Sequence, residues 1–93
     1  MPSFEFDPQK SAANHAKHGI DFIEAQALWT DPARVERGVV HPTELRSQVI
    51  GRIGAVMWSA FITYRHDSIR LISVRHARQS ERDLYARSRD SHR

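Results

Sequence analysis

Hydrophobic residues recur at a helical period through the first third of the chain, which predicts two helices there. A short strand or lead-in is predicted before the first helix, which follows Asp7 and ends at Gly19, because a carboxylate favours a helix start and a glycine favours a helix end. The second begins where Asp21 and Glu24 have the spacing of a capping box, and Pro32 ends it. We expect its hydrophobic stripe to enter the core: Phe22, Ala25, Leu28 and Trp29.

The pattern changes near residue 35 to short runs rich in β-branched and aromatic residues. In the last of these runs, simple alternation places Arg75 on the same side as Leu71, and Val74 with His76 on the other side. Because the links between the runs are short, they predict an antiparallel meander of three to four strands. The runs are residues 34–41, 45–53, 55–64 and 68–76.

A final helix is predicted to begin at Ser80, with Asp83 three residues later, and residues 88–93 are expected to fray at its end. The predicted order is therefore α-α-β-β-β-β-α. This order indicates an α+β fold, and the length of 93 residues suits a single domain.

Composition restricts the chemistry available to such a domain. The chain has no cysteine, which excludes disulfides and thiolate metal sites. It also has no apolar run near the roughly 20 residues that a membrane-spanning helix needs. We therefore expect a cytoplasmic protein without a membrane partner.

Positive charge gathers in the last third of the chain. Residues 1–64 carry six Lys and Arg against seven Asp and Glu, whereas residues 65–93 carry eight Arg against four acidic residues. Because a guanidinium fits phosphate through two parallel hydrogen bonds, the arginines indicate a phosphate-bearing partner. The alternative is a solvated helix whose arginines only promote solubility.

Two other kinds of chemistry have little support in the sequence. His15 and His18 lie three residues apart on the first predicted helix, but no recognised metal-binding motif accompanies them, so we expect no metal. A nucleophilic serine motif of the form GxSxG is also missing.

The junction of the last strand with the last helix, "RLISVRHARQSERDLY", holds the most promising set of side chains. Metal-free RNA cleavage needs a base for the 2′-hydroxyl, a cation for the phosphorane and an acid for the leaving oxygen. Arginine suits the second role, and histidine, glutamate or tyrosine suits the others. The same residues would equally serve a non-catalytic RNA- or DNA-binding module, or a basic face that meets an acidic protein.

The sequence resembles the BrnT family of toxins in two separate motifs. The opening segment is similar to that family's F-E-W-D, N-x-x-K-H-G, aromatic, E-A and D-P pattern, with Phe6 in place of the tryptophan. The strand end is similar to its R-I-I-S-A-R-x-A-x-x-x-E-R-x-x-Y pattern. The matching positions are Phe4, Glu5, Asp7, Asn14, Lys17, His18, Gly19, Phe22, Glu24, Ala25, Asp31, Pro32, Arg46, Gly51, Arg70, Ile72, Ser73, Arg75, Ala77, Glu81, Arg82 and Tyr85.

This resemblance implies a type II toxin–antitoxin toxin with a RelE-like ribonuclease fold. It implies metal-independent RNA cleavage that arrests translation and growth. It also implies a BrnA-type antitoxin with a ribbon-helix-helix DNA-binding part, and the toxin contacts operator DNA only through its complex with this antitoxin. The matched motifs make these residues site candidates: Lys17, His18, Arg70, Arg75, Glu81, Arg82 and Tyr85.

Among the candidates, Arg75 and Arg82 are expected to hold the scissile phosphate, while Glu81, His18 or His76 moves protons. Other residues are expected to bind RNA: Lys17, Arg70, His76, Arg78 and Tyr85. We expect the substitution Arg75→Ala to abolish toxicity and leave the fold intact.

Each of these residues also has a structural interpretation. Lys17 and His18 suit the end of a helix, and Arg70 suits an ion pair with an acid. Glu81 suits the cap of its own helix, and Tyr85 suits the core with its hydroxyl at the rim.

Overall fold

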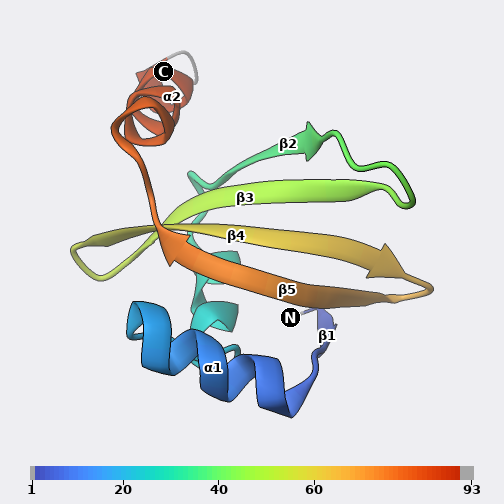
Figure 1. The fold of residues 1–93 in the computed structure, drawn as a ribbon. Helices are drawn as coiled ribbons and strands as arrows, with labels where there is room; N and C mark the ends of the chain where they lie inside the picture. Colours follow the sequence, from blue (N-terminus) through green and yellow to red (C-terminus); the bar gives the residue numbers. More distant parts are fainter. Residues whose placement is uncertain (1, 91–93) are drawn as a thin grey trace.

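The computed structural model describes residues 2–90 and has five strands in one mixed sheet (Figure 1). The strands lie in the order β1-β5-β4-β3-β2. Helix α1 (Pro8–His18) lies along the β5 edge of the sheet and helix α2 (Gln79–Asp90) lies over β2 and β3, while a 3₁₀ helix, η1 (Glu24–Thr30), packs on the face opposite α2. The strands are β1 (Ser3–Glu5), β2 (Val35–Val39), β3 (Arg46–Ile53), β4 (Val56–Arg65) and β5 (Ser68–His76).

The α+β class is confirmed, and strands β2 to β5 form the predicted antiparallel meander. The segment before Asp7, expected as a short strand or lead-in, contains β1, a fifth strand of the sheet that pairs in parallel with β5 from Ser3 opposite Ser68 to Glu5 opposite Arg70. A three-residue strand is too short to show alternation, so the sequence pattern gave no sign of its long-range pairing.

The first helix has the predicted boundaries. The side chain of Asp7 accepts a hydrogen bond from Gln9 N (2.8 Å). At the other end Gly19 adopts a left-handed backbone with φ 80°. Such a conformation is one that glycine adopts without steric cost.

The second predicted helix forms as the 3₁₀ helix η1. The capping box is present, because Asp21 Oδ1 accepts from Glu24 N (2.7 Å) and Glu24 Oε1 accepts from Asp21 N (3.1 Å). The segment has only seven residues before Asp31 caps its end. Side chains three residues apart lie on one face of a 3₁₀ helix, which places Ala25 and Leu28 together, and Phe22 precedes them in the turn before η1. These three side chains are fully buried, as the hydrophobic stripe predicted.

Strand β5 contains a β-bulge. Phe61 of β4 pairs with Ser73, whereas the following residue, Ile62, pairs with Leu71. Ile72 is therefore an extra residue in β5, which bends the strand and shifts its alternation.

The core lies between the sheet and η1 together with the segment that precedes η1. Its members come from residues 20–22, η1, β3, β4 and β5: Ile20, Phe22, Ala25, Leu28, Trp29, Val49, Trp58, Ala60, Ile62, Ile69, Leu71 and Val74. The other face of the sheet is covered only where α2 meets β2 and β3, and the rest of it, the open face, is accessible.

The end of the chain is described in part. Residues 88–90 of the segment expected to fray belong to α2, and residues 91–93 lie outside the described residues. None of the described helices is both long and apolar enough to cross a membrane.

Candidate active site

The bulge in β5 determines where Arg75 points. Beyond the extra residue Ile72, Val74 is fully buried on the core side with Leu71. Arg75 consequently turns to the open face, opposite to the side that simple alternation predicted. That prediction was wrong because it assumed an unbroken period of two, which an inserted residue shifts by one.

An ion pair joins the end of β5 to the start of α2. Arg75 Nη1 donates to Glu81 Oε1 (2.8 Å), and Arg75 Nη2 donates to Glu81 Oε2 (2.9 Å). Glu81 also accepts from the backbone N–H of Arg78 (2.8 Å), so its side chain caps the helix that carries it. The side chain of Glu81 is 5% exposed and that of Arg75 is 22% exposed. One carboxylate therefore fixes both the guanidinium and the start of α2.

A buried glutamine extends this ion pair to a second guanidinium. Gln48 Nε2 donates to Glu81 Oε2 (2.6 Å) and to Ser59 Oγ (2.7 Å). Its amide oxygen accepts from Arg37 Nε (2.8 Å) on the neighbouring strand β2. Arg37, Gln48, Glu81 and Arg75 therefore form a continuous chain across four elements, which we call the guanidinium network.

The network keeps Glu81 ionised. The hydrogen bond from Arg75 is the main influence on this carboxyl; together with those from Arg78 and Gln48 it outweighs burial and lowers the pKa of Glu81 from 4.5 to about 2. The same hydrogen bond raises the pKa of Arg75 above its ordinary value. The network thus carries two positive charges and one negative charge, a net of one positive charge.

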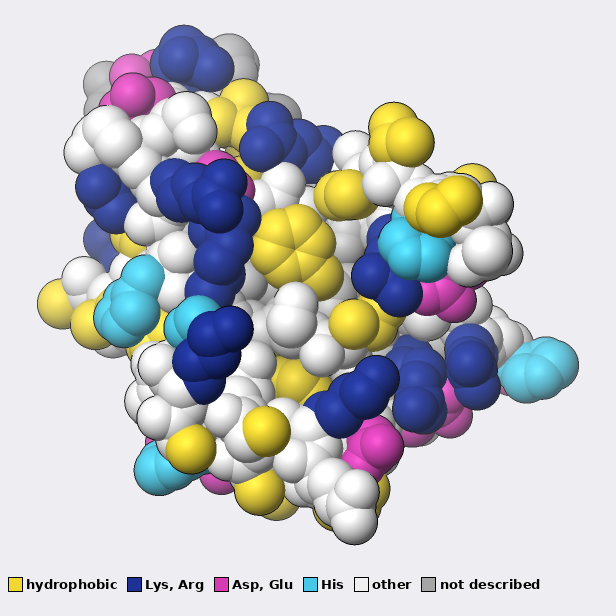
Figure 2. Space-filling model, viewed as in Figure 1, with side chains coloured by type: hydrophobic (Ala, Val, Ile, Leu, Met, Phe, Trp, Pro, Cys, Tyr) yellow, Lys and Arg dark blue, Asp and Glu magenta, His cyan; other side chains and the backbone are white. Residues whose placement is uncertain are grey.

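The guanidinium of Arg75 lies over an aromatic ring. Its Cζ atom is 5.2 Å from the centroid of Phe61, a distance typical of a cation–π contact. Figure 2 shows hydrophobic side chains in the middle of this side of the molecule, with Lys and Arg side chains in groups around them. The surface can accordingly offer both a flat apolar contact and positive charge.

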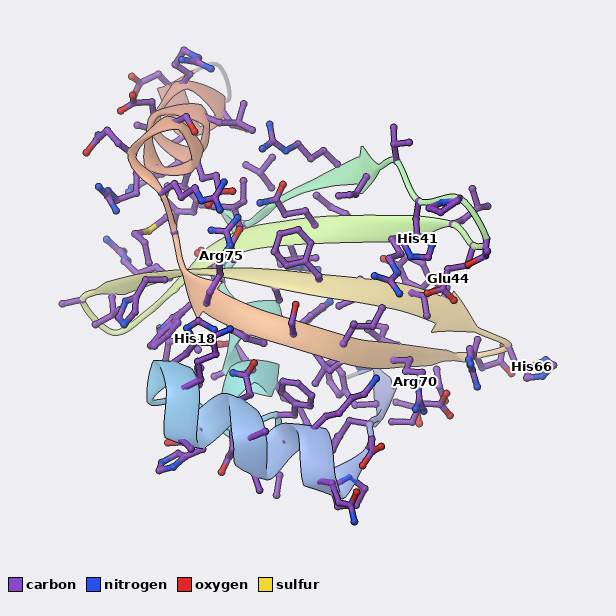
Figure 3. The ribbon with its side chains drawn as sticks, viewed as in Figure 1. His18, His41, Glu44, His66, Arg70 and Arg75 are labelled. Carbon is purple, nitrogen blue, oxygen red and sulfur yellow. The ribbon has the colours of Figure 1, made fainter. Side chains whose placement is uncertain are left out.

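His18 lies at the same end of the sheet as Arg75 (Figure 3). It is the last residue of α1, one helical turn beyond Asn14. Asn14 fixes this helix against β5, because its amide donates to Val74 O (2.9 Å) and accepts from Val74 N (3.1 Å). Residues separated by one turn share a helix face, so His18 lies beside the end of β5.

Two further candidates of the junction, Arg82 and His76, contact other parts of the protein. Arg82 donates to Ala77 O (2.6 Å) and Gln79 Oε1 (2.7 Å). These hydrogen bonds fix the link before α2, and they direct the guanidinium of Arg82 to other partners than the Arg75–Glu81 ion pair. His76 faces away from Arg75 and stacks on Trp58, with ring centroids 4.2 Å apart. The side chain of Arg78 is exposed.

Tyr85 is buried between α2 and the segment that follows η1. Its hydroxyl donates to Asp31 Oδ2 (2.9 Å), which also accepts from Arg52 N (2.9 Å). Burial, followed by the hydrogen bond to Asp31, raises the pKa of Tyr85. This arrangement matches the interpretation of Tyr85 as a core residue with its hydroxyl at the rim.

Two candidates lie away from the network. Arg70 is at the other end of β5, where its Nη1 is 3.7 Å from Glu5 Oε1. Lys17 is exposed on α1. The structure therefore brings Arg75, Glu81 and His18 to one end of the sheet and places Arg70 at the other.

The sequence interpretation missed two residues of the network, Arg37 and Gln48, and also Ser59, which accepts a hydrogen bond from Gln48. Gln48 had no distinct signal, because the run 45–53 also contains Arg46, Ser47 and Arg52 and the pattern does not show which polar residue is buried. Arg37 had no signal either, because its run has no clear buried side.

The described residues contain no group of three or more His, Asp or Glu placed to hold a metal ion. His15 is exposed and His18 half-buried on the same helix.

Comparison with known families agrees with the resemblance in the sequence. The family model described as the ribonuclease toxin BrnT of a type II toxin–antitoxin system matches residues 6–81. No curated protein matches the chain. The matched range contains Arg37, Gln48, Arg75 and Glu81 and most of the open face.

Proposed function

Because the chain belongs to the BrnT family of ribonuclease toxins of type II toxin–antitoxin systems, we propose that the guanidinium network is its RNA-cleaving site. The proposal rests on one observation above all. Two guanidiniums from different strands, Arg37 and Arg75, are linked through Gln48 and Glu81 on an accessible face of the sheet.

In the proposed reaction, the 2′-hydroxyl oxygen attacks the adjacent phosphorus while the bond to the 5′-oxygen breaks. The 2′-hydroxyl loses a proton to a base, and the leaving oxygen gains one from an acid. Negative charge builds on the phosphate oxygens in the transition state. Arg75 and Arg37 stabilise this charge, because fixed guanidiniums need no reorganisation when the charge develops.

Glu81 is a positioning residue in this proposal. A carboxyl with a pKa of about 2 is a weak base at neutral pH, and it is almost never protonated there to act as an acid. Its two oxygens instead hold the guanidinium of Arg75 in one orientation.

His18 is the residue that we propose for proton transfer. Histidine is the side chain whose ordinary pKa lies closest to neutral pH, so it exchanges protons readily under cellular conditions. His18 is half-buried at the end of α1, beside the strand end that carries Arg75.

The family implies an RNA substrate and an antitoxin partner. We propose that this partner is a BrnA-like antitoxin with a ribbon-helix-helix part, that it binds operator DNA together with the toxin, and that it inhibits by covering the open face. We further propose that RNA cleavage needs no metal, occurs in the cytoplasm and arrests translation. The proposal that the antitoxin covers the open face is supported by the exposed arginines of that face, because they suit an acidic protein segment as well as RNA.

A cleavage assay with EDTA tests the proposed function. Purified protein is incubated with labelled RNA in EDTA, and a parallel RNA carries 2′-deoxyribose at the cleaved position. We expect fragments ending in a 2′,3′-cyclic phosphate from the first RNA and no cleavage at the substituted position of the second. An intact RNA that only shifts in a native gel would instead indicate a binding module, and cleavage restored only by added Mg²⁺ would contradict the metal-free mechanism.

A further inference from the structure

A positively charged pocket lies at the opposite end of β5 from Arg75. It has a volume of about 190 Å³. Its lining comes from α1, β3, β4, β5 and the link between β2 and β3, so elements distant in sequence form one site. The charged residues around it are Lys10, Arg46, Arg65, Arg70 and Glu44.

The positive charges of this pocket are only partly balanced. Arg46 Nε is 2.7 Å from Glu44 Oε1, a distance that corresponds to a hydrogen bond. Arg65 and Arg70 share one carboxylate, Glu5, at the longer distances of 3.9 and 3.7 Å. Within the described part of the chain, four cations therefore face two carboxylates, and three of the four make no hydrogen bond to either. This arrangement leaves cationic N–H donors around the pocket that make no hydrogen bond to Glu5 or Glu44.

The pocket lies on the same face of the sheet as the guanidinium network. Arg70 pairs with Thr63 and Arg75 pairs with Ser59 on β4, and these β4 residues are an even number apart, so both arginines point to the open face. The strand rise gives a separation of about 13–16 Å along β5. Figure 3 places the two labelled arginines at opposite ends of the strand.

The surface between the two sites is suited to a nucleotide chain. Phe61 and Ile72 lie along it, and each is half-buried. Aromatic rings exposed beside a basic groove are a common platform for the bases of single-stranded RNA. Figure 2 shows the same arrangement, with hydrophobic side chains between two groups of Lys and Arg.

We propose that the pocket of Lys10, Arg46, Arg65 and Arg70 binds a backbone phosphate of the RNA a few nucleotides from the cleaved bond. This inference rests on the proposed function, because the cleaved bond is placed at Arg75. Phosphate suits the pocket since guanidiniums bind it through paired N–H donors. The pocket is a positioning subsite that increases RNA affinity and leaves the chemical step unchanged.

The test uses the double variant Lys10→Gln with Arg65→Gln, two exposed residues of the pocket. The matched control is Arg87→Gln with Arg89→Gln, which removes the same charge from the last turn of α2. We expect the pocket variant to raise KM about tenfold and to change kcat less than twofold, because it removes binding shared by the ground and transition states. The slope of log affinity against log salt should fall by about 0.7, the value for one phosphate contact on a single strand.

A set of RNAs with one neutral methylphosphonate linkage each locates the phosphate. One linkage distant from the cleaved bond should weaken binding to the wild-type protein and have no further effect on the pocket variant. If the pocket and control variants bind every RNA equally, the subsite does not exist, even though cleavage by the wild type would still uphold the proposed function. If the pocket variant keeps its KM for RNA but loses inhibition by the antitoxin, the pocket serves the protein partner and the inference is overturned.

Discussion

The side chain of Glu81 carries a negative charge at a position that water hardly reaches. It is 5% exposed, and its oxygens accept hydrogen bonds from Arg75, Gln48 and the backbone of Arg78. These partners replace the hydration that the carboxylate loses on burial. The folded chain therefore depends on Glu81 being ionised.

This dependence predicts a loss of stability in acid. The pKa of Glu81 is about 2 in the folded chain and ordinarily 4.5, so its contribution is complete above pH 4.5 and is lost as the pH falls toward 2. Glu81 should contribute roughly 2–3 kcal/mol to the free energy of unfolding at neutral pH. Urea unfolding between pH 7 and pH 3 should show this fall in the wild type and a weaker fall in Glu81→Gln. The matched control Asp67→Asn, an exposed carboxylate in the β4–β5 turn, should keep the wild-type dependence; equal curves for all three proteins would contradict the burial argument.

The same contacts change the expectation for Arg75→Ala. This substitution leaves the carboxylate of Glu81 buried without its main partner, which typically costs several kcal/mol. A domain of this size has little stability to lose, since about 5–15 kcal/mol is usual. Loss of toxicity in Arg75→Ala would therefore not distinguish unfolding of the protein from loss of catalysis. The variant Arg75→Lys keeps the positive charge beside Glu81 and separates these two causes.

At the scale of the elements, Asn14 holds α1 to the edge of the sheet. Strand β1 pairs with only the first part of β5, and beyond it the amide of Asn14 takes the place of a neighbouring strand at Val74. The same amide also donates to Ile20 O (2.8 Å) at the end of the helix. This buried side chain therefore joins the helix, the turn after it and the strand beyond the bulge.

The substitution Asn14→Ala should destabilise the chain by about 2–4 kcal/mol, because it leaves buried backbone groups of Val74 and Ile20 without partners. The amide proton of Val74 should also exchange faster with solvent, which hydrogen-exchange NMR measures. His15→Ala, an exposed position on the same helix, is the control and should change stability by less than about 0.5 kcal/mol. If the two variants unfold at the same urea concentration, Asn14 does not have this role.

The elements were predictable to different degrees, for physical reasons. Asp7 and Gly19 act locally, so the sequence predicted the boundaries of α1 correctly. The strands followed from composition, but the bulge at Ile72 arises from pairing between β4 and β5, which no local pattern reveals. The direction of Arg75 depended on that bulge and was therefore predicted wrongly.

The residues of the candidate site were likewise predictable where the signal is local and unpredictable where it depends on strand pairing. The motif that contains Arg75 and Glu81 identified the junction of β5 with α2, and the structure brings these two residues together. Arg37 and Gln48 join them only because β2 and β3 fold alongside β4. Residues contributed by neighbouring strands require the register, and the register is set by contacts distant in sequence.

At the scale of the whole molecule, the two sides of the sheet have separate tasks. One side buries the core under η1, and the other presents arginines around half-buried hydrophobic side chains. A strand of RNA that follows β5 would meet the guanidinium network at one end and the pocket of Lys10, Arg46, Arg65 and Arg70 at the other. The rigid sheet keeps these sites at a fixed separation, which helps to place one phosphodiester bond at Arg75.

The most direct test of the central claim is the single-turnover rate of RNA cleavage in EDTA, compared between the wild type and Arg75→Lys. Lysine keeps the positive charge but cannot make the paired hydrogen bonds of the guanidinium. We expect the rate of cleavage to fall by about 10²–10³, the usual cost of removing one group that stabilises transition-state charge. Circular dichroism and urea unfolding should show that Arg75→Lys is folded under the assay conditions. A folded Arg75→Lys protein that cleaves RNA as fast as the wild type would contradict the placement of the reacting phosphate at Arg75.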